Sequence, residues 1–377
     1  MRRFKLIFFV TEDWYFYSHR LPLAIAAKDA GYDVSVITHV NKHGELIRQA
    51  GIRLIPFDLS RRGMNLVSEL SVIKRLIKIY REEMPDILHH VAMKPVIYGS
   101  FAARFAGVSN VVNAFAGLGY IFTSTDLKAR LLRAVMGLSL RWLINRKKSR
   151  LILQNQDDSE LLIGKGFINK ERVRLIKGSG VDINIYSPTK EPDGAPLVIL
   201  ASRMLWAKGI KEFVEAARYL KSRGVIARFA LIGDSDMHNP SSISVDQLSD
   251  WDSEGVVEWW GHKSDMPNVI SKSNIVCLPS FYGEGIPKVL IEAASCGRAI
   301  VTTNTPGCKE IVIDGENGLL VPIRNPEKLA DAIGTLIANN GLRKKMGENG
   351  RKLVENNFSL KIVIEKTMEV YKELLGQ

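Results

Sequence analysis

The sequence predicts an α/β protein with two domains, each built on a parallel sheet that helices cover on both faces. Three observations lead to this expectation. The chain has 377 residues, which is enough for two separate cores. Short apolar runs alternate with helical patterns from end to end, as they do in proteins with parallel sheets. One segment, 187–196, is dense in proline and polar residues, which is typical of an inter-domain linker.

The first domain is expected at 1–186. Seven short apolar runs predict its strands, at 5–10, 34–38, 53–56, 87–91, 110–113, 150–153 and 172–176. Helical periodicity lies between these runs, most clearly at 20–30, 66–83 and 127–146. Residues 11–19, after the first strand, are rich in aromatic side chains and are predicted to form a loop that opens onto a helix start at Arg20.

The second domain is expected at 187–358, and a C-terminal helix at 359–377 follows it. Its strands are predicted at 197–201, 228–232, 256–259, 275–279, 299–302 and 318–321. Helices are predicted at 210–222, 326–339 and 341–356, with the last helix at about 360–375. Two such Rossmann-like domains facing each other across a cleft place the active site where the carboxyl ends of both sheets meet.

The net charge of +12 is concentrated in the first half of the chain. Residues 1–190 contain 30 Lys and Arg against 16 Asp and Glu, whereas the remaining residues contain 22 against 24. A basic half beside a nearly neutral half indicates an anionic partner, which could be phospholipid, a diphosphate or nucleic acid. Solubility alone is the simpler explanation of the same charge.

The cysteines and the hydropathy indicate an intracellular protein. Cys277, Cys296 and Cys308 form no Cys-x-x-Cys pair, which argues for a reducing compartment without structural zinc or disulfides. The apolar run after Met1 is too short for a signal peptide, and no window of 18 apolar residues predicts a membrane-spanning helix. We therefore expect a protein in the cytosol or on a membrane surface.

A strand–loop–helix segment at 275–292 has the features of a diphosphate site. Gly285 lets the backbone come close to a ligand, and Pro287 suits a first helical turn. The N–H groups of Ile286, Lys288 and Val289 can then point at an anion. Glu292 lies about one turn further on and could reach the ribose attached to that diphosphate. A helix with one capping and one surface glutamate is the alternative.

A second charged loop follows the predicted strand at 197–201. Arg203 and Lys208 lie five residues apart on it, so that they form a two-pronged cation for phosphate oxygens. Together with Glu284 and Glu292, which form a Glu-x7-Glu pattern, this Arg-x4-Lys-Gly loop resembles the retaining glycosyltransferases of family 4, which have the GT-B fold and use nucleotide-sugar donors. Two solvated basic residues on a loop are the alternative.

The resemblance implies a role for each matching residue. Arg203 and Lys208 would stabilise the leaving diphosphate, and Glu284 would bind hydroxyls of the donor sugar. Gly261 and His262 fall in the loop whose backbone contacts the nucleotide base in the family. The last helix of such proteins commonly packs back on the first domain. No protein nucleophile is assigned, because the family's retention is usually attributed to same-face attack, with a donor phosphate oxygen taking the proton.

The first half resembles the family more loosely. Many relatives carry a histidine near the reacting sugar in the loop that corresponds to 115–120, and this chain has none there. Gly117 and Gly119 of that loop, with His19 and Arg20, are expected on the acceptor side. Arg20 would hold a phosphate or an acceptor diphosphate, or else would pair with Asp13.

These motifs, with the segment 236–241, resemble a subgroup of bacterial enzymes that glycosylate polyprenyl-diphosphate-linked saccharides. The enzyme that adds N-acetylgalactosamine in bacterial N-glycan assembly belongs to this subgroup.

Neither a metal nor a cofactor is expected. Asp234 and Asp236 form an Asp-x-Asp pattern, but they follow a strand of the second domain, where Arg203 and Lys208 already supply positive charge. We therefore interpret this pattern as a structural or acceptor-side loop. Trp251, Trp259 and Trp260 could form a stacking platform, although core positions are expected for two of the three.

The stretch 127–150 combines basic and apolar residues and suits an anionic membrane surface. A core helix with a solvated basic face is the alternative. A lipid-linked acceptor favours the membrane, so we expect a peripheral protein on the inner face of the cell membrane.

Together these features predict a retaining, metal-independent glycosyltransferase of surface glycan synthesis. It would move an N-acetylhexosamine or a hexose from a UDP-sugar to a hydroxyl of a polyprenyl-diphosphate-linked saccharide. A nucleotide-sugar epimerase of the same fold is one alternative. A non-enzymatic protein that binds nucleotide-sugars or nucleic acid is another, but it gives no reason for Glu284 and Glu292 beside Arg203 and Lys208.

Overall fold

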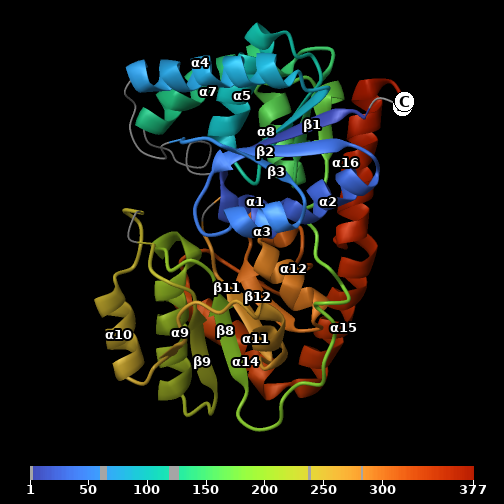
Figure 1. The fold of residues 1–377 in the computed structure, drawn as a ribbon. Coiled ribbons are helices and arrows are strands. Elements are labelled where there is room, and N and C mark those ends of the chain that lie inside the picture. Colours follow the sequence, from blue (N-terminus) through green and yellow to red (C-terminus); the bar gives the residue numbers. More distant parts are fainter. Residues whose placement is uncertain (1–2, 60–65, 119–126, 237–238, 282) are drawn as a thin grey trace. The chain divides into compact units, whose positions relative to one another are not determined.

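The computed structural model describes residues 3–59, 66–118, 127–236, 239–281 and 283–377 (Figure 1). The chain forms two compact units, described separately below. Unit 1 contains Met1–Ser179 together with Leu360–Gln377, and unit 2 contains Gly180–Ser359.

Unit 1 is built on a seven-stranded parallel sheet with the order β3-β2-β1-β4-β5-β6-β7. Its strands are β1 (Lys5–Glu12), β2 (Asp33–His39), β3 (Arg53–Pro56), β4 (Ile87–Val91), β5 (Val111–Ala114), β6 (Ser149–Leu153) and β7 (Val173–Leu175). All pairs are parallel, for example Leu6 of β1 beside Val34 of β2 and Ile87 of β4. Apolar β-branched and aromatic residues fill these strands because both faces of the sheet are buried.

The helices of unit 1 cover both faces of this sheet. They are α1 (Asp13–His19), α2 (Leu21–Asp29), α3 (Gly44–Gln49), α4 (Leu66–Glu83), α5 (Met93–Ala106), α7 (Leu127–Ile144), α8 (Gln156–Gly164) and α16 (Leu360–Leu375). Leu6, Phe8 and Val10 of β1 face one core with α2 and α16, whereas Ile7 and Phe9 face another with α4 and α5. A third core lies among α5, α7 and α8. This alternation is the period-2 pattern of a strand.

The loop predicted at 11–19 is wrong, because β1 runs to Glu12 and α1 follows directly. Asp13 lies in the first turn, where a carboxylate interacts favourably with the positive end of the helix dipole. Its Oδ2 also accepts hydrogen bonds from the backbone N–H groups of Asn41 (2.6 Å) and His43 (2.9 Å). Phe16 is the one fully buried aromatic residue of this helix, and its ring packs edge-on against Phe8. The helix was therefore not predicted, because the aromatic run lacks clear apolar periodicity.

The last helix of the chain, α16, completes unit 1. Tyr371 is fully buried, and its hydroxyl lies 2.6 Å from Nδ1 of His89 on β4. Glu373 of α16 forms hydrogen-bonded ion pairs with Arg150 of β6 and Arg174 of β7, at one edge of the unit 1 sheet. Residues nearly 300 positions apart in sequence thus share one core.

Unit 2 is a six-stranded parallel sheet with the order β10-β9-β8-β11-β12-β13. Its strands are β8 (Leu197–Ala201), β9 (Arg228–Ile232), β10 (Glu258–Trp259), β11 (Ile275–Leu278), β12 (Ala299–Thr303) and β13 (Gly318–Val321). Its helices are α9 (Ile210–Ser222), α10 (Val245–Ser253), α11 (Met266–Ser271), α12 (Lys288–Ser295), α13 (Pro306–Lys309), α14 (Pro326–Ala338) and α15 (Asn340–Asn357). Separate cores on the two faces contain α9 with α14 and α12 with α13.

The predicted fold class is confirmed, since both units are parallel sheets with helices on both faces. Both also share one topological property. The strand order reverses direction beside the first strand of each unit, between β1 and β4 in unit 1 and between β8 and β11 in unit 2. In open α/β sheets, ligands bind outside the carboxyl ends of the strands at such a switch point.

Candidate active site

The predicted donor residues of unit 2 lie on the two loops at its switch point. Arg203 and Lys208 follow β8, and Glu284 follows β11, which pairs with β8 in the sheet. A tight contact holds the loops together, because Gly209 adopts φ +75° and packs on the carbonyl of Pro279. A Cβ at this position would lie 2.1 Å from that carbonyl oxygen, so only glycine fits.

The cation and the carboxylate of these loops form an ion pair. Nζ of Lys208 lies 2.6 Å from Oε2 of Glu284, and both side chains are more than four-fifths buried. The hydroxyl of Ser280 donates to the other carboxylate oxygen, Oε1, at 2.6 Å. Glu284 is thereby fixed in one orientation by two partners from different positions along the chain. Sequence reasoning grouped Lys208 with Glu284 but missed Ser280.

Arg203 is the more exposed of the two loop cations. Its guanidinium lies 3.2 Å from Oδ2 of Asp236, and about half of the side chain is accessible. Asp234, two residues earlier, accepts a hydrogen bond from the backbone N–H of His262 at 2.9 Å. Gly261, at φ +64°, makes the turn that brings this N–H into place. The Asp-x-Asp pattern thus holds a cation and a loop, and the described residues contain no cluster of three or more metal-ligating side chains.

The start of α12 lies beside this pair. The helix begins at Lys288 with Pro287 as its N-cap residue, so the proline stands one position before the predicted first turn. Gly285 and Ile286 precede it, and Val289 lies in the first turn, where the helix dipole is positive. Gly307 of α13 packs directly on the carbonyl of Gly285, since a Cβ there would clash at 1.3 Å. This contact holds the loop before α12 in a defined shape.

Glu292 lies one turn inside α12 and is only 6% exposed. Burial raises the pKa of this carboxyl, and both Lys288 and the hydroxyl of Tyr186 oppose the shift. Nζ of Lys288 is 3.3 Å from its Oε1. Tyr186, which directly precedes the predicted linker, was not identified from the sequence, because nothing in its neighbourhood suggests contact with a helix about a hundred residues later.

The predicted acceptor-side residues of unit 1 follow its first strand. His19 is the last residue of α1, and its ring stacks on Tyr15 at 4.2 Å between centroids. Arg20 is only 4% exposed, and it hydrogen-bonds Tyr15, whose pKa is raised by burial and lowered less strongly by this arginine. Among the described residues, Nε of Arg20 and Nε2 of the nearby His89 have no hydrogen-bond partner. The alternative ion pair with Asp13 does not form, since Asp13 binds backbone amides instead.

Two further positions lie at carboxyl ends of unit 1 strands. Gly117 follows β5 with φ +104°, a conformation that glycine favours, whereas Gly119 lies outside the described residues. Ala92 directly follows β4 at the switch point and has φ 79° and ψ 165°. This backbone conformation costs an ordinary residue energy, and strained residues of this kind gather at functional sites. Nothing in the sequence around Ala92 signals this strain.

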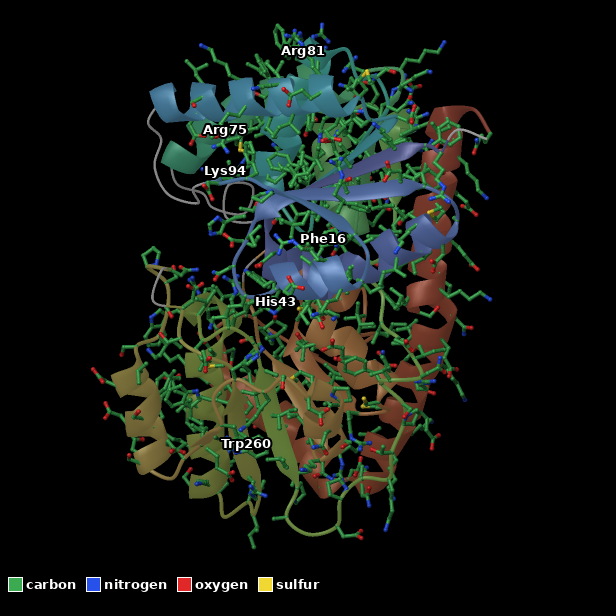
Figure 2. All side chains as sticks on the ribbon, viewed as in Figure 1. Phe16, His43, Arg75, Arg81, Lys94 and Trp260 are labelled. Atoms are coloured by element: carbon green, nitrogen blue, oxygen red, sulfur yellow. The ribbon has the colours of Figure 1, made fainter. Side chains whose placement is uncertain are left out.

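The three tryptophans predicted as core or platform take separate positions. Trp251 is buried, and its ring meets Trp206 edge-on. Trp259 donates its indole N–H to the carbonyl of Gly233, and Trp260 (Figure 2) donates to Glu258. Each is thus part of the packing of unit 2, and the described contacts do not assemble a platform.

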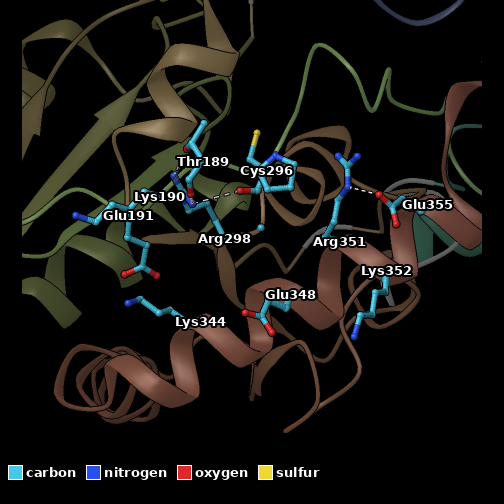
Figure 3. Close-up of a pocket in the computed structure, with 12 residues that line it drawn as sticks. Thr189, Lys190, Glu191, Cys296, Arg298, Lys344, Glu348, Arg351, Lys352 and Glu355 are labelled. Carbon is cyan, nitrogen blue, oxygen red and sulfur yellow. Dashed lines mark hydrogen bonds and ion pairs between the residues drawn. The ribbon is translucent and has the colours of Figure 1, made fainter.

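A separate pocket opens at the opposite end of α12 (Figure 3). It is bordered by the linker at 188–191, by Cys296–Arg298 and by α15. Its buried floor residue Arg298 donates to the carbonyl and hydroxyl of Thr189, and Arg351 pairs with Glu355. None of the predicted donor residues borders it, so it is distinct from the candidate active site.

Two family models match successive parts of the chain. Residues 5–156 match the family described as Glycosyl transferase 4-like, and residues 183–353 match Glycosyl transferases group 1. Among the described residues, no helix has the length and apolar character needed to cross a membrane.

Curated relatives match along most of the chain. N,N'-diacetylbacillosaminyl-diphospho-undecaprenol alpha-1,3-N-acetylgalactosaminyltransferase of Campylobacter jejuni is 28% identical over 372 residues, which cover 95% of this chain and 96% of the relative. UDP-Gal:alpha-D-GlcNAc-diphosphoundecaprenol alpha-1,3-galactosyltransferase of Escherichia coli is 25% identical and covers 83% of this chain and 82% of its own.

Solved structures share the fold at low sequence identity. HepE of Anabaena, in complex with UDP and glucose, matches 98% of this chain and all of its own, with a TM-score of 0.79 and 19% identity. Sucrose-phosphate synthase of Thermosynechococcus elongatus matches 99% of this chain and all of its own, with a TM-score of 0.82 and 19% identity. These likenesses confirm the GT-B fold that the sequence predicts.

Proposed function

We propose that this chain, which matches Glycosyl transferase 4-like over residues 5–156 and Glycosyl transferases group 1 over residues 183–353, transfers a sugar from a UDP-sugar to a polyprenyl-diphosphate-linked saccharide. The transfer retains the configuration at the anomeric carbon, and the sugar is an N-acetylhexosamine or a hexose. This reaction belongs to the synthesis of a surface glycan.

One observation carries the donor side of this proposal. The buried ion pair of Lys208 and Glu284 lies at the switch point of unit 2, with Arg203 on the same loop and the start of α12 nearby. A diphosphate that binds here exchanges the carboxylate partner of Lys208 for phosphate oxygens. Glu284 is then available to the hydroxyls of the donor sugar, and Glu292 to the ribose. Fixed cations and helix N–H groups of this kind stabilise charge that grows on a leaving group.

The chemical step follows from this arrangement. The acceptor hydroxyl attacks the anomeric carbon on the face from which the diphosphate departs. The bond between the anomeric carbon and the phosphate oxygen breaks, and its electron pair leaves with UDP. The proton of the acceptor hydroxyl moves to an oxygen of the departing diphosphate. Arg203 and Lys208 stabilise the negative charge that develops there. No protein nucleophile takes part, because the acceptor hydroxyl attacks the anomeric carbon directly.

The acceptor class rests on the two curated relatives, both of which are named for substrates linked to undecaprenyl diphosphate. An acceptor of this kind is held in a lipid bilayer by its polyprenyl chain. We therefore place the protein on the inner face of the cell membrane, as a peripheral protein. In unit 1, buried Arg20 is the proposed contact of the acceptor diphosphate.

The enzyme is proposed to work without a metal ion, because Arg203 and Lys208 supply the positive charge that a divalent cation would otherwise provide. Turnover in EDTA should stay within about twofold of turnover in buffer. The control is the same assay after EDTA is neutralised with excess Mg²⁺ or Mn²⁺. Loss of activity that only added metal restores would contradict this part of the proposal.

The full proposal is tested by a screen of UDP-sugars against polyprenyl-diphosphate-linked saccharides, read by mass spectrometry. The expected product is the acceptor extended by one sugar, with the donor's anomeric configuration by NMR. The control omits the acceptor and reports any epimerised or hydrolysed sugar. Release of free sugar or an epimer at the full rate without acceptor would overturn the transferase in favour of an epimerase.

A further inference from the structure

Helices α5 and α7 lie side by side on one face of the unit 1 sheet, next to α4 (Figure 1). The inner side of α7 is buried through Met136, Leu140, Leu143 and Ile144, which pack into the core shared with α5 and α8. An amphipathic helix of a globular protein would be polar on its other side. The outer side of α7 departs from this rule.

Leu138, Arg141 and Trp142 lie on the outer side of α7 at helical spacing i, i+3 and i+4. Leu138 is 69% exposed and Trp142 is 47% exposed. Three residues with the same spacing, Phe101, Arg104 and Phe105, form the matching stripe on α5, and Phe105 is 50% exposed.

The two stripes contact each other. The ring of Phe101 lies 5.9 Å from that of Trp142 and 4.7 Å from that of Phe105. The guanidinium of Arg104 lies over the indole of Trp142, 4.3 Å from its centroid. The neighbouring helix also joins, since Arg81 of α4 (Figure 2) donates to the carbonyl of Phe105. We call these six residues, Phe101, Arg104, Phe105, Leu138, Arg141 and Trp142, the α5/α7 surface.

The charged residues of α5 and α7 are all cations, whereas the adjacent α4 also carries acidic residues. Residues 87–156, which include both helices, contain ten Lys and Arg and a single acid, Asp126. Burial, and to a lesser degree the proximity of Arg104, lowers the pKa of Arg146. Lys147 and Lys148 beside it are exposed. A solvated basic face would account for the charge but not for an exposed Leu, Phe and Trp in contact with it.

We propose that the α5/α7 surface binds an anionic lipid bilayer, with Trp142, Phe105 and Leu138 in the headgroup region and the surrounding arginines on lipid phosphates. Indole rings favour the boundary between headgroups and acyl chains, and cations near an anionic leaflet add attraction. The binding itself follows from these residues, and its use in catalysis rests on the proposed lipid-linked acceptor.

The structure also corrects the linear stretch 127–150 that the sequence indicates. Arg150, the last cation of that stretch, is buried and pairs with Glu373 of α16, so it faces away from any membrane. Half of the surface instead comes from α5, which the sequence did not single out. The membrane-facing residues are therefore set by two helices in contact and not by one amphipathic segment.

Two other occupants fit the surface less well. A second copy of the chain in a two-fold dimer would place this cationic surface against itself, and like charges would repel. Nucleic acid would satisfy the arginines, but it offers no apolar layer for Leu138, whose side chain stands mostly in water. An anionic bilayer supplies both a negative surface and an apolar layer.

The test is flotation of the full chain with vesicles of phosphatidylcholine alone and of phosphatidylcholine mixed with phosphatidylglycerol. The protein should bind the anionic vesicles and should bind them more weakly as salt rises. Changing Leu138→Ala with Trp142→Ala should weaken binding about ten- to a hundredfold, at low and high salt alike, because apolar burial is lost. Changing Arg104→Glu with Arg141→Glu should weaken it about tenfold or more at low salt, with less effect at high salt.

The matched control changes Lys366→Glu with Lys372→Glu, two exposed lysines of α16 on the other face of the unit 1 sheet. It alters the net charge by the same amount and should leave binding unchanged. If the control and the arginine variant lost vesicle binding equally, net charge alone would explain the effect, and the proposed role of the α5/α7 surface would be overturned. Equal binding to neutral and anionic vesicles would overturn it as well.

Two more outcomes would overturn the proposal. The first is binding to duplex or single-stranded DNA that the Trp142 variant does not weaken and that vesicles cannot displace. The second is a dimer, detected by light scattering, that the Trp142 variant no longer forms. None of these assays needs a donor or an acceptor, so their failure is distinguishable from failure of glycosyl transfer. If a double variant does not fold by circular dichroism, Trp142→Ala alone supports the same comparison, with a smaller expected loss.

Discussion

The two units share a strand order but differ in how the charged side chains at their switch points are paired. In unit 2 the lysine, arginine and glutamate side chains of the candidate donor site all have partners of opposite charge, namely Lys208 with Glu284, Arg203 with Asp236 and Lys288 with Glu292. In unit 1, buried Arg20 has a phenol as its partner, and no ion pair with a carboxylate is found for it among the described residues.

This difference shows how one topology can carry two kinds of charged site. A buried cation without a counter-ion is costly, because its hydration is lost without compensation. A paired cation is compensated before any substrate arrives. We infer that the paired charge of Lys208 in unit 2 also contributes to stability, whereas the charge of Arg20 in unit 1 is retained for binding. Four predictions test this contrast, beginning with the largest effect.

Lys208→Ala should lower kcat about tenfold to about 150-fold, because one hydrogen bond to the charged leaving group is lost. The variant should also melt earlier, since Glu284 stays largely buried without its cation. Steady-state kinetics and thermal unfolding measure both effects. Lys211→Ala removes a cation from an exposed pair of α9 and serves as the control. Normal turnover in a folded Lys208 variant would mean that the donor binds elsewhere.

Arg20→Met should weaken the use of the acceptor about tenfold in kcat/KM, while thermal stability stays level or rises. The comparison rests on this difference, since the Lys208 variant should lose thermal stability and the Arg20 variant should not. Kinetics at varied acceptor concentration, with melting curves, provide the measurement. Arg48→Met on the surface of α3 is the matched control. A large fall in melting temperature with unchanged kinetics would show that Arg20 is structural.

Ala92→Gly should stabilise unit 1 by about 1 kcal/mol, because glycine adopts this backbone conformation without strain. Unit 2 already has glycine at its tight positions, such as Gly209. Urea unfolding gives the free energy of unfolding. In contrast, Ala106→Gly, at the end of the same helix, should cost up to about 1 kcal/mol. If Ala92→Gly lowered the free energy of unfolding, the backbone at Ala92 would not be strained in the way we infer.

The pH dependence of stability should have opposite signs for two glutamates. Burial raises the pKa of Glu292, so its contribution is full below the ordinary value of 4.5 and is lost as pH rises through the raised pKa. For Glu373, burial acts in the same direction, but the hydrogen bonds of Arg150 and Arg174 outweigh it and lower the pKa. Its contribution is present above 4.5 and is lost as pH falls through the lowered pKa.

Urea unfolding of Glu292→Gln and Glu373→Gln across this pH range measures the two slopes. Relative to the unchanged protein, the Glu292 variant should gain stability as pH rises, and the Glu373 variant should lose it. Parallel curves for all three proteins would show that neither carboxyl titrates differently in the folded state.

Most strands and the long helices were predictable from the sequence, because each is a local pattern. Periodicity and turn residues place the helix at Leu66–Glu83 and the strand at Leu197–Ala201 with their observed ends. The charged donor residues were also found, since the two loops carry recognisable spacings. Helix α1 was missed because Phe16 is its one buried apolar residue, so the sequence shows no apolar periodicity there.

The remaining features depend on contacts between distant parts of the chain. Ser280 binding Glu284, Tyr186 beside Glu292 and Arg150 paired with Glu373 are consequences of the folded arrangement. No local pattern announces them, because the side chains involved would serve equally well on a solvated surface. The same holds for the α5/α7 surface, whose two stripes are unremarkable until the helices are side by side.

The return of α16 to unit 1 bears on how the protein is made. Unit 2 is one continuous piece of chain, so all of its strands have been synthesised before the ribosome reaches Leu360. Unit 1 starts before unit 2 in the chain but lacks Tyr371 and Glu373 until α16 has been synthesised, which leaves His89 and Arg150 without these partners meanwhile. Unit 1, whose larger segment is translated before unit 2, is therefore expected to reach its final structure after unit 2, contrary to the usual order in which domains fold during synthesis.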